Sequence, residues 1–228
     1  MAWPCGAPAL FRETRMPRRF AQLTFTDSVK AVQAHYGTRS HNERYEASAL
    51  DNVELGARER EFIAARDSFY LATVSESGWP YVQHRGGGAG FLKVLDAKTL
   101  AFADFRGNLQ YQSVGNLGRD DRVSLILVDY AQRRRLKLLG HARVIDVDQS
   151  AAAGDLMPAW PGQLPIDDAG GKVERVLLIV VEAFDWNCSQ HITPRFSECE
   201  MQQAINPLQQ RIAVLEARLH ELACEPPP

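Results

Sequence analysis

The stretch from Pro80 to Leu117, PYVQHRGGGAGFLKVLDAKTLAFADFRGNLQYQSVGNL, decides the fold of this 228-residue chain. It opens with a strand-like segment, passes through the glycine-rich run 86–90 and continues into a second strand pattern at 91–95. Turn residues at 96–98 lead into a third strand pattern at 99–104. A helix is expected from Leu109 to Leu117, so the predicted order is strand, glycine loop, strand, turn, strand and helix.

Further strand patterns flank this stretch on both sides. Aromatic and β-branched residues predict strands at 69–75 and 79–85, and an almost wholly apolar run predicts a buried strand at 122–129. Alternating residues predict a long strand over 134–148 that bends or bulges at Gly140, and 175–184 predicts the last strand. Six or seven closely spaced strands with few helices between them indicate a mainly β protein with peripheral helices, built as an antiparallel barrel.

The N-terminal part, residues 1–56, is predicted to be an extension that contains a helix. Residues 1–20 show no periodicity, and the composition changes at Met16, which is therefore an alternative start of the protein. Thr26 and Gly37 have the character of a helix start and end. Residues 38–55 are polar and predict a surface connection, and a second helix is expected at 57–66.

Two segments follow or interrupt the barrel. Residues 149–172 are rich in Pro and Gly and predict a loop, which is either a flexible excursion or a lid. The tail 197–228 carries a heptad row: Met201, Ile205, Leu208, Ile212, Leu215, Leu219 and Leu222. A capping box at Ser197 and Glu200 predicts a helix from Glu198, and Asn206–Pro207 predicts a fresh cap and a kink. The heptad row is expected to pack on its own barrel or on a second subunit, and its short length favours docking on a dimer that the barrel forms.

Composition excludes several classes of protein. Hydrophobic residues make up 45%, charged residues 24%, and the formal net charge is −2, so nothing favours a nucleic-acid partner. No apolar run approaches the ~20 residues of a membrane span, and no secretory signal is visible, so a cytoplasmic protein is expected. The four cysteines lack metal-binding or redox spacing, so unpaired thiols and no structural metal are expected.

The basic residues of the deciding stretch lie at strand ends or at the mouth of the loop: His84, Arg85, Lys93 and Arg106. This placement suits a phosphorylated ligand. Asn108 is expected to cap the helix that starts at Leu109, whose free N–H groups would stabilise a phosphate, with hydroxyl groups from Tyr111 and Ser113. A capped helix with solvated polar residues explains the same pattern equally well. The glycine run is not a Walker loop, and no hydrolase triad is readable.

Short motifs in this order resemble the pyridoxamine 5′-phosphate oxidase-like family of FMN-binding split barrels. The matching features are Gly78-x-Pro80-Tyr81, Phe91-Leu92-Lys93, Leu100–Asp104, Asp121–Leu125, Arg135–Ala142, and Trp186 followed by Arg195-Phe196. The resemblance covers roughly residues 57–196, which are expected to form the FMN-binding split-barrel domain. The Gln-His-Arg-Gly-Gly stretch and the ending Trp-Asn-Cys-x-Gln-His-Ile-Thr-Pro-Arg-Phe are most similar to a flavin-nucleotide-binding branch of the family.

The resemblance implies a homodimer with FMN at the subunit interface. It assigns cofactor roles to Gln83, Phe91, Lys93, Asp104, Gln112, Ser113, Arg135, Trp186 and Arg195. Gln112 and Ser113 replace an Arg-Lys pair that grips the phosphate in the oxidases. Arg85 and Lys93 are therefore expected to supply the missing charge, aided by His84 and the helix end at Asn108. His191 and Thr193 replace the Arg-x-His pair that holds the pyridoxal substrate, which argues against a vitamin B6 phosphate substrate. His191 is itself a candidate cofactor-binding residue.

Two classes of function follow from these expectations. The first is an FMN-dependent oxidoreductase that acts on an unidentified small molecule. The second is a flavin-binding or regulatory dimer without turnover. A weaker alternative is the same barrel with deazaflavin or haem in place of FMN. No catalytic residue can be named from the sequence.

Overall fold

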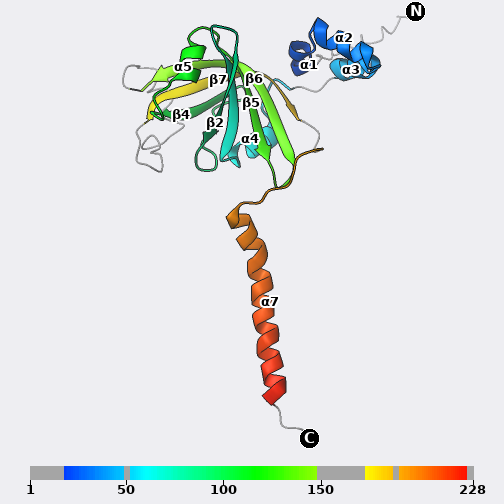
Figure 1. Ribbon diagram of the computed structural model, residues 1–228, viewed down its shortest axis with the longest axis vertical. Coiled ribbons are helices and arrows are strands. Elements are labelled where there is room, and N and C mark those ends of the chain that lie inside the picture. The colour runs from blue at the N-terminus through cyan, green and yellow to red at the C-terminus, as the bar shows by residue number, and fades with distance from the viewer. Residues whose placement is uncertain (1–17, 49–51, 148–172, 187–189, 225–228) are drawn as a thin grey trace, which may run out of the picture. The chain divides into compact units, whose positions relative to one another are not determined.

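The computed structural model describes residues 18–48, 52–147, 173–186 and 190–224 (Figure 1). By contacts the chain divides into two units. The first runs to Val128 and resumes from Arg135 to Asn187, and the second comprises Asp129–Arg134 and the residues from Cys188 onward. The alternative start at Met16 and the predicted loop at 149–172 lie outside the described residues.

The first unit is built on a seven-stranded sheet with the order β2-β1-β5-β6-β7-β4-β3. The strands are β1 Ser68–Val74, β2 Pro80–Gly86, β3 Lys93–Val94, β4 Thr99–Phe105, β5 Arg122–Asp129, β6 Arg134–Asp146 and β7 Val173–Trp186. The neighbours β1–β2, β1–β5, β3–β4, β4–β7 and β6–β7 pair antiparallel. The sheet curves round on itself, as Figure 1 shows, which confirms the predicted antiparallel barrel with peripheral helices.

The alternation of side chains along the strands places one large apolar cluster inside the barrel. Phe69, Leu71, Leu125, Leu138 and Ile179 are among its fully buried members. Because successive strand residues point to opposite faces, β5 buries every second residue, as the period-2 pattern requires. This cluster forms the packed interior of the barrel.

The long β6–β7 pair contains the bulge that the sequence predicts at Gly140. Leu139 pairs with Ala183 but Gly140 pairs with Val181, so Glu182 is an extra residue on β7. A Cβ atom at position 140 would collide with the carbonyl oxygen of Val180. Only glycine permits this close approach of the two backbones.

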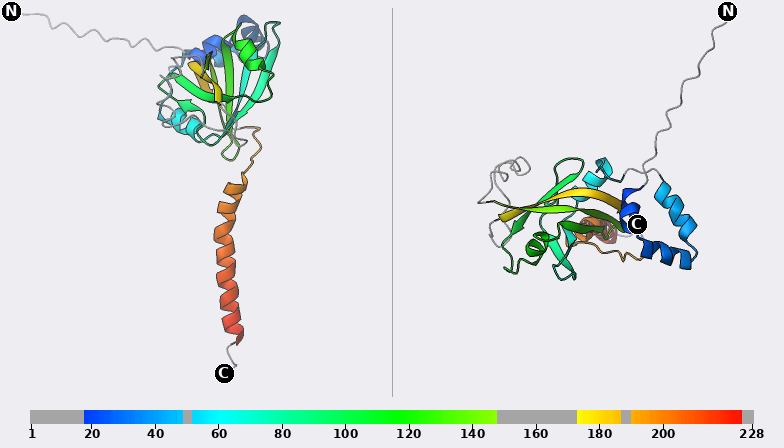
Figure 2. Two further views of the ribbon diagram at one scale, coloured as in Figure 1. Left: turned by 90° about the vertical axis from the view of Figure 1, so that its left-hand side faces the viewer. Right: turned by 90° about the horizontal axis from the view of Figure 1, so that it is seen from above.

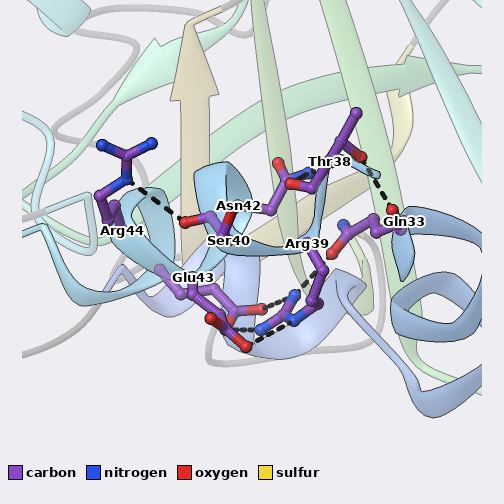
Figure 3. Close-up of polar contacts among 8 residues, drawn as sticks. Gln33, Thr38, Arg39, Ser40, Asn42, Glu43 and Arg44 are labelled. Atoms are coloured by element: carbon purple, nitrogen blue, oxygen red, sulfur yellow. Dashed lines mark hydrogen bonds and ion pairs between the residues drawn. The ribbon is translucent and has the colours of Figure 1, made fainter. Parts of the chain in front are cut away.

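The polar segment 38–55 is not a plain surface connection, and that prediction is wrong. It contains the helix α3, Arg39–Ala47, which follows α2, Asp27–His35. The Arg39 side chain donates to Glu46 Oε2 at 2.6 Å, to Glu43 Oε1 at 3.2 Å and to Gln33 Oε1 at 2.5 Å (Figure 3). Glu43 lies one turn and Glu46 two turns further along α3, and Gln33 belongs to α2. Charge pairs along α3 therefore stabilise it, and it lacks the apolar stripe that would reveal it in the sequence.

Residues of the N-terminal extension bind the bulged part of β7. The guanidinium of Arg19, at the start of α1 (Arg19–Thr24), is hydrogen-bonded to Glu182. Tyr45 Oη donates to Asp185 Oδ1 at 2.6 Å, and Asn52 Nδ2 donates to the carbonyl oxygen of Phe184 at 2.7 Å. The helices α1 to α3 therefore belong to the same unit as the barrel; Figure 2 gives two further views of them.

The glycine run binds the backbone of the α4–β1 connection. The N–H groups of Gly87 and Gly90 donate to the carbonyl oxygens of Asp67 and Arg66, next to the end of α4 (Ala57–Ala64). A Cβ atom at position 87 would lie 2.9 Å from the side chain of Phe91. The run thus holds the chain close to the α4–β1 connection. As a result the predicted strand at 91–95 shrinks to the two residues of β3.

Two helix predictions need correction: α5 begins later than predicted, and α7 has no second N-cap at Asn206. The helix α5 runs from Gln112 to Leu117 and does not begin at Leu109, because Leu109 (φ 63°) and Tyr111 (φ 50°) have left-handed backbones. The helix α7, Glu198–Cys224, begins where the capping box predicts it, and continues through Pro207. The Asn206 side chain accepts a hydrogen bond from Gln202 at 2.6 Å, so the predicted fresh cap is absent. None of the helices in the described part of the chain is long and apolar enough to cross a membrane.

Candidate functional site

A cavity of about 230 Å³ opens at the rim of the barrel, within the first unit. It lies among β2, the end of β4, the loop that follows it, α5 and the start of β7. The residues that line it are Tyr81, Gln83, Arg85, Asp104, Phe105, Arg106, Gly107, Asn108, Gln110, Tyr111, Gln112, Ser113, Val114 and Arg175. Seven of the residues that the sequence nominates line this cavity: Gln83, Arg85, Asp104, Asn108, Tyr111, Gln112 and Ser113.

The alternation of β2 decides which of its residues reach the cavity. Tyr81, Gln83 and Arg85 share one face of the strand and all line the cavity. His84 points to the other face, where its ring packs edge-on against Tyr70 at 5.5 Å between centroids. The structure therefore separates His84 from the other nominated residues of this strand.

Asp104 is the centre of the charged groups in the cavity. Its carboxylate is buried and accepts hydrogen bonds from Arg85 Nη1 at 2.6 Å and from Arg175 Nε at 3.0 Å. Burial alone would lower the pKa of Arg175, but the hydrogen bond to Asp104 and the charge of its carboxylate hold that pKa above its ordinary value. Both guanidinium groups are therefore fixed, charged and shared by one acid.

A second acid, Glu174, organises the mouth of the cavity. Its carboxylate lies 3.1 Å from Arg106 Nε and 2.9 Å from Arg175 Nη1, and it accepts a hydrogen bond of 3.4 Å from the Tyr111 hydroxyl. The Arg175 guanidinium also stacks over the Tyr111 ring at 4.8 Å. Three arginines thus surround the cavity, while only two carboxylates balance them, and the site has an excess of positive charge.

The neutral side of the cavity is formed where α5 meets the first two strands. Ser113 is buried and donates its hydroxyl to Gln83 Oε1 at 2.9 Å. Asn116 Nδ2 donates to Thr73 Oγ1 at 2.9 Å. Asn108 accepts a hydrogen bond from the Gln110 N–H at 3.2 Å. Its side chain therefore closes the loop between β4 and α5 and does not cap the helix, which corrects the sequence-based expectation.

Several nominated residues lie outside the cavity lining. Phe91 stacks on Phe69 in the core at 5.5 Å between centroids, and Lys93 lies on β3, opposite Ala101 of β4. Arg135 stands near the start of β6. His191 and Arg195 belong to the second unit, in which the Arg195 guanidinium stacks over the Tyr130 ring at 5.0 Å.

Trp186, at the end of β7, has partners within its own chain. Its indole Nε1 donates to Glu59 Oε1 at 2.7 Å, and the Arg58 guanidinium stacks over its ring at 4.3 Å. Phe62 packs edge-on against the same ring at 4.7 Å between centroids. The nominated tryptophan is thus held at the junction of α4 and β7.

Sequence reasoning missed Arg175, which lies 71 residues away from Asp104 along the chain. The available signal was a charged residue at the head of an otherwise apolar strand pattern. Arg175 is the register partner of Asp104 in the β4–β7 pair, so the two charges face each other once these strands are adjacent. Strand adjacency, which a single sequence does not reveal, is the information that was lacking.

The family model for pyridoxamine 5′-phosphate oxidase matches residues 55–184, more than half of the chain. The chain therefore belongs to the pyridoxamine 5′-phosphate oxidase-like family of flavin-binding proteins. No curated protein sequence matches it.

Solved structures with a similar fold are remote in sequence. HupZ from Group A Streptococcus is 16% identical, with a TM-score of 0.44, and the match covers 62% of this chain and 99% of HupZ. An FMN-binding protein from Syntrophomonas wolfei is 13% identical, with a TM-score of 0.41 and a match over 71% of this chain and 97% of that one. An F420 reductase is 20% identical, with a TM-score of 0.38 and a match over 55% of this chain and 94% of that one. The family assignment rests on the family model.

Proposed function

We propose that this chain binds FMN in the cavity around Asp104 and acts as an FMN-dependent oxidoreductase on a small molecule. The observation that supports the proposal is the excess of guanidinium groups in the cavity of a flavin-binding family member. Arg85, Arg106 and Arg175 line it, and Asp104 is the one carboxylate among the lining residues.

The donor set fits a phosphate monoester, which carries ≈ −1.5 to −2 charges at neutral pH and has three acceptor oxygens. Within the described residues, the buried Nε of Arg85 has no hydrogen-bond partner. The hydroxyl groups of Tyr111 and Ser113 lie on the same cavity. The three guanidinium groups match the charge of a phosphate, without the Arg-Lys pair of the oxidases. The two hydroxyls would add to them once they exchanged their present acceptors, Gln83 and Glu174.

The assignment of the phosphate contacts changes from the one that the sequence favours. Arg85 stays in the proposal, together with Ser113. Arg106 and Arg175 take the place of Lys93 as the further cations, because they line the cavity. The amide oxygen of Gln83 accepts from Ser113 Oγ at 2.9 Å, so in this proposal its amide nitrogen is the group that would face the flavin.

A bound flavin supplies the electron transfer, and the residues of this chain bind it, orient it and shield it from water. We further propose a homodimer, in which the second subunit completes the flavin site. Arg135 and Trp186, which the family resemblance assigns to the cofactor, do not line the cavity of their own chain. A second subunit is the simplest source of such residues. The alternative is a flavin carrier without turnover, and the stopped-flow experiment described below separates it from an enzyme.

The test compares FMN with riboflavin, which has no phosphate. Both are titrated into the wild-type protein and into Arg85→Ala, with flavin fluorescence as the readout. The loss of one charge-assisted contact costs ~1.5–3 kcal/mol, so FMN affinity should fall roughly ten- to a hundred-fold while riboflavin affinity changes little. His84→Ala, on the opposite face of β2, is the matched control and should leave both affinities unchanged.

An equal loss for the two flavins would mean that Arg85 serves the ring or the fold, and the phosphate assignment would then be wrong. Failure of the wild-type protein to bind any flavin would overturn the proposed function itself. Stopped-flow reduction of the flavin-loaded protein by NADH or NADPH separates the enzyme from the carrier. The absorption spectrum of the purified protein distinguishes flavin from haem or deazaflavin.

A further inference from the structure

The helix α7 presents a continuous apolar row that the proposed flavin site does not use. Figure 1 shows α7 as one long helix, and its bounds are Glu198–Cys224. The row consists of Met201, Ile205, Leu208, Ile212, Leu215 and Leu219, and each of these residues has a relative exposure of 36% to 66%. Leu222 continues the same spacing in the sequence. Such a row at alternating intervals of four and three residues is the seam of a coiled coil.

The residue types along the seam indicate how many helices it joins. Counted as heptads, position a holds Ile205, Ile212 and Leu219, and position d holds Met201, Leu208, Leu215 and Leu222. Isoleucine at a combined with leucine at d favours a parallel two-stranded coiled coil over higher oligomers. Pro207 falls at position c, on the outside of the seam, so it does not interrupt the packing.

The charged residues beside the seam indicate the identity and direction of the partner helix. Arg211 lies at position g and Glu216 at the following position e. In a parallel pair, position g of one helix faces the next position e of the other, so Arg211 of each chain meets Glu216 of the partner subunit. An antiparallel pair would bring g positions together and set arginines against each other. The pattern is therefore complementary to a parallel second copy of itself.

Neither of these charges has an opposite charge at helical neighbour spacing. The residues three and four positions from Arg211 are Pro207, Leu208, Val214 and Leu215. Those around Glu216 are Ile212, Ala213, Leu219 and His220. Because intrahelical ion pairs form at these spacings, Arg211 finds no acid on its own helix and Glu216 only a histidine. The complementarity is thus directed across the seam.

We infer that α7 pairs with α7 of a second copy of this chain as a parallel, in-register two-stranded coiled coil, held by the a and d seam and by two Arg211–Glu216 contacts between subunits. This pairing does not depend on the proposed flavin site. It supplies a dimer contact in addition to any contact between barrels, and it involves only residues of α7.

The first test uses charge reversal in the full-length chain. Arg211→Glu alone places two acids opposite each other in the homodimer, and Glu216→Arg alone places two arginines opposite each other. Mixed together, the two single variants form heterodimers in which both contacts are attractive. In an equal mixture, native mass spectrometry should show a ratio of heterodimer to total homodimer that is roughly three-fold or more above the statistical ratio of about one. The preference should fade at 1 M salt, where the Debye length is about 3 Å.

A statistical mixture at low salt would overturn the inference, because it means that the dimer forms elsewhere or that α7 docks on its own barrel. Both positions are exposed, so the variants should fold like the wild type. The double variant Arg211→Glu with Glu216→Arg restores attraction within a homodimer and is the control for a general loss of stability.

The second test fixes direction and register. The four native cysteines are replaced by serine, and a single cysteine is introduced at position a by Leu219→Cys or at position f by Ala217→Cys. In a parallel, in-register pair the two cysteines at 219 adjoin and should oxidise to a covalent dimer, while those at 217 face outward and should not. At 1.5 Å rise per residue, an antiparallel pair centred on the seam would separate the two residues 219 by roughly 20 Å. Equal cross-linking of the two variants, or none at 219, would show that the arrangement is wrong.

Discussion

Arg85 of β2 donates a hydrogen bond of 2.6 Å to Asp104 of β4, although these strands stand near opposite ends of the sheet order. Only β3 lies beyond β4 at its end, and β2 is itself the other edge. The contact therefore bridges the gap that the ladder hydrogen bonds leave open. The same two residues link the two end regions of the sheet and place charged groups in the candidate site.

Replacing Asp104 by alanine should destabilise the protein and leave two guanidinium groups without their shared acid. Removing one partner of a buried ion pair typically costs ~3–5 kcal/mol. The midpoint of urea unfolding should fall accordingly, with an unchanged slope. Asp104→Asn retains an acceptor oxygen and should lose clearly less. Equal stability of Asp104→Ala and the wild type would show that the bridge contributes nothing to barrel closure.

Replacing Gly140 by alanine should also destabilise the barrel, because the added methyl group collides with the Val180 carbonyl oxygen. Overpacking of this kind costs ~1–3 kcal/mol. The matched control is Gly115→Ala in α5, where a Cβ meets nothing within 4 Å and the helical backbone suits alanine. That substitution should be neutral or stabilising by ~0.5–1 kcal/mol. Thermal unfolding of the two variants gives the comparison, and a shift of the same sign in both would contradict the proposed cause.

Acid should weaken the ion pair between Arg39 and Glu46 within α3. The hydrogen bond from Arg39 lowers the pKa of Glu46 from its ordinary value of 4.5. A carboxyl whose pKa is depressed by folding contributes stability above its unfolded pKa and loses it as the pH falls through the folded value. The contribution should therefore be intact at neutral pH and decline below about pH 4.5. An NMR titration of the Glu46 carboxyl carbon measures this pKa, and Arg39→Gln should raise it toward its ordinary value.

Truncation before Pro207 should weaken the dimer without unfolding the barrel, because the removed residues carry most of the seam of α7. Each of these apolar side chains stabilises a packed interface by ~1.5–3 kcal/mol when it is fully buried. Sedimentation velocity over a range of concentrations measures the change in dimer dissociation. Unchanged dissociation after truncation would show that the seam has no role in assembly.

The sequence predicted the elements whose patterns are local. Aromatic, β-branched and apolar runs located most of the long strands and alternation located β6; Gly140 located the bulge, and Ser197 with Glu200 located the start of α7. It failed at α3, which is stabilised by the Arg39 charge cluster and lacks an apolar stripe. It also placed the start of α5 three residues early, because left-handed backbones at non-glycine residues leave no mark in the sequence.

Half of the candidate site was predictable for the same reason. Seven cavity residues within the stretch 80–117 were recognised because they are close in sequence and carry charged, hydroxyl or amide groups. Arg175 comes from β7, and only the register of β7 against β4 places it beside Asp104. The site is thus an outcome of strand pairing over long sequence distances, and such pairing is what a single sequence specifies least directly.

The extra residue at Glu182 changes which face of the sheet the side chains of β7 point to, so that the two parts of the strand make different contacts. On one side of the bulge, β7 brings Arg175 to the carboxylate of Asp104, and on the other side it brings Asp185 to the hydroxyl of Tyr45. Because a slip of one residue turns every strand side chain to the opposite face, the two contacts require different phases of one strand. The bulge reconciles them. Deleting Glu182 would force the strand into a single phase, and the chain would have to give up either the charged rim of the barrel or the anchorage of its N-terminal helices.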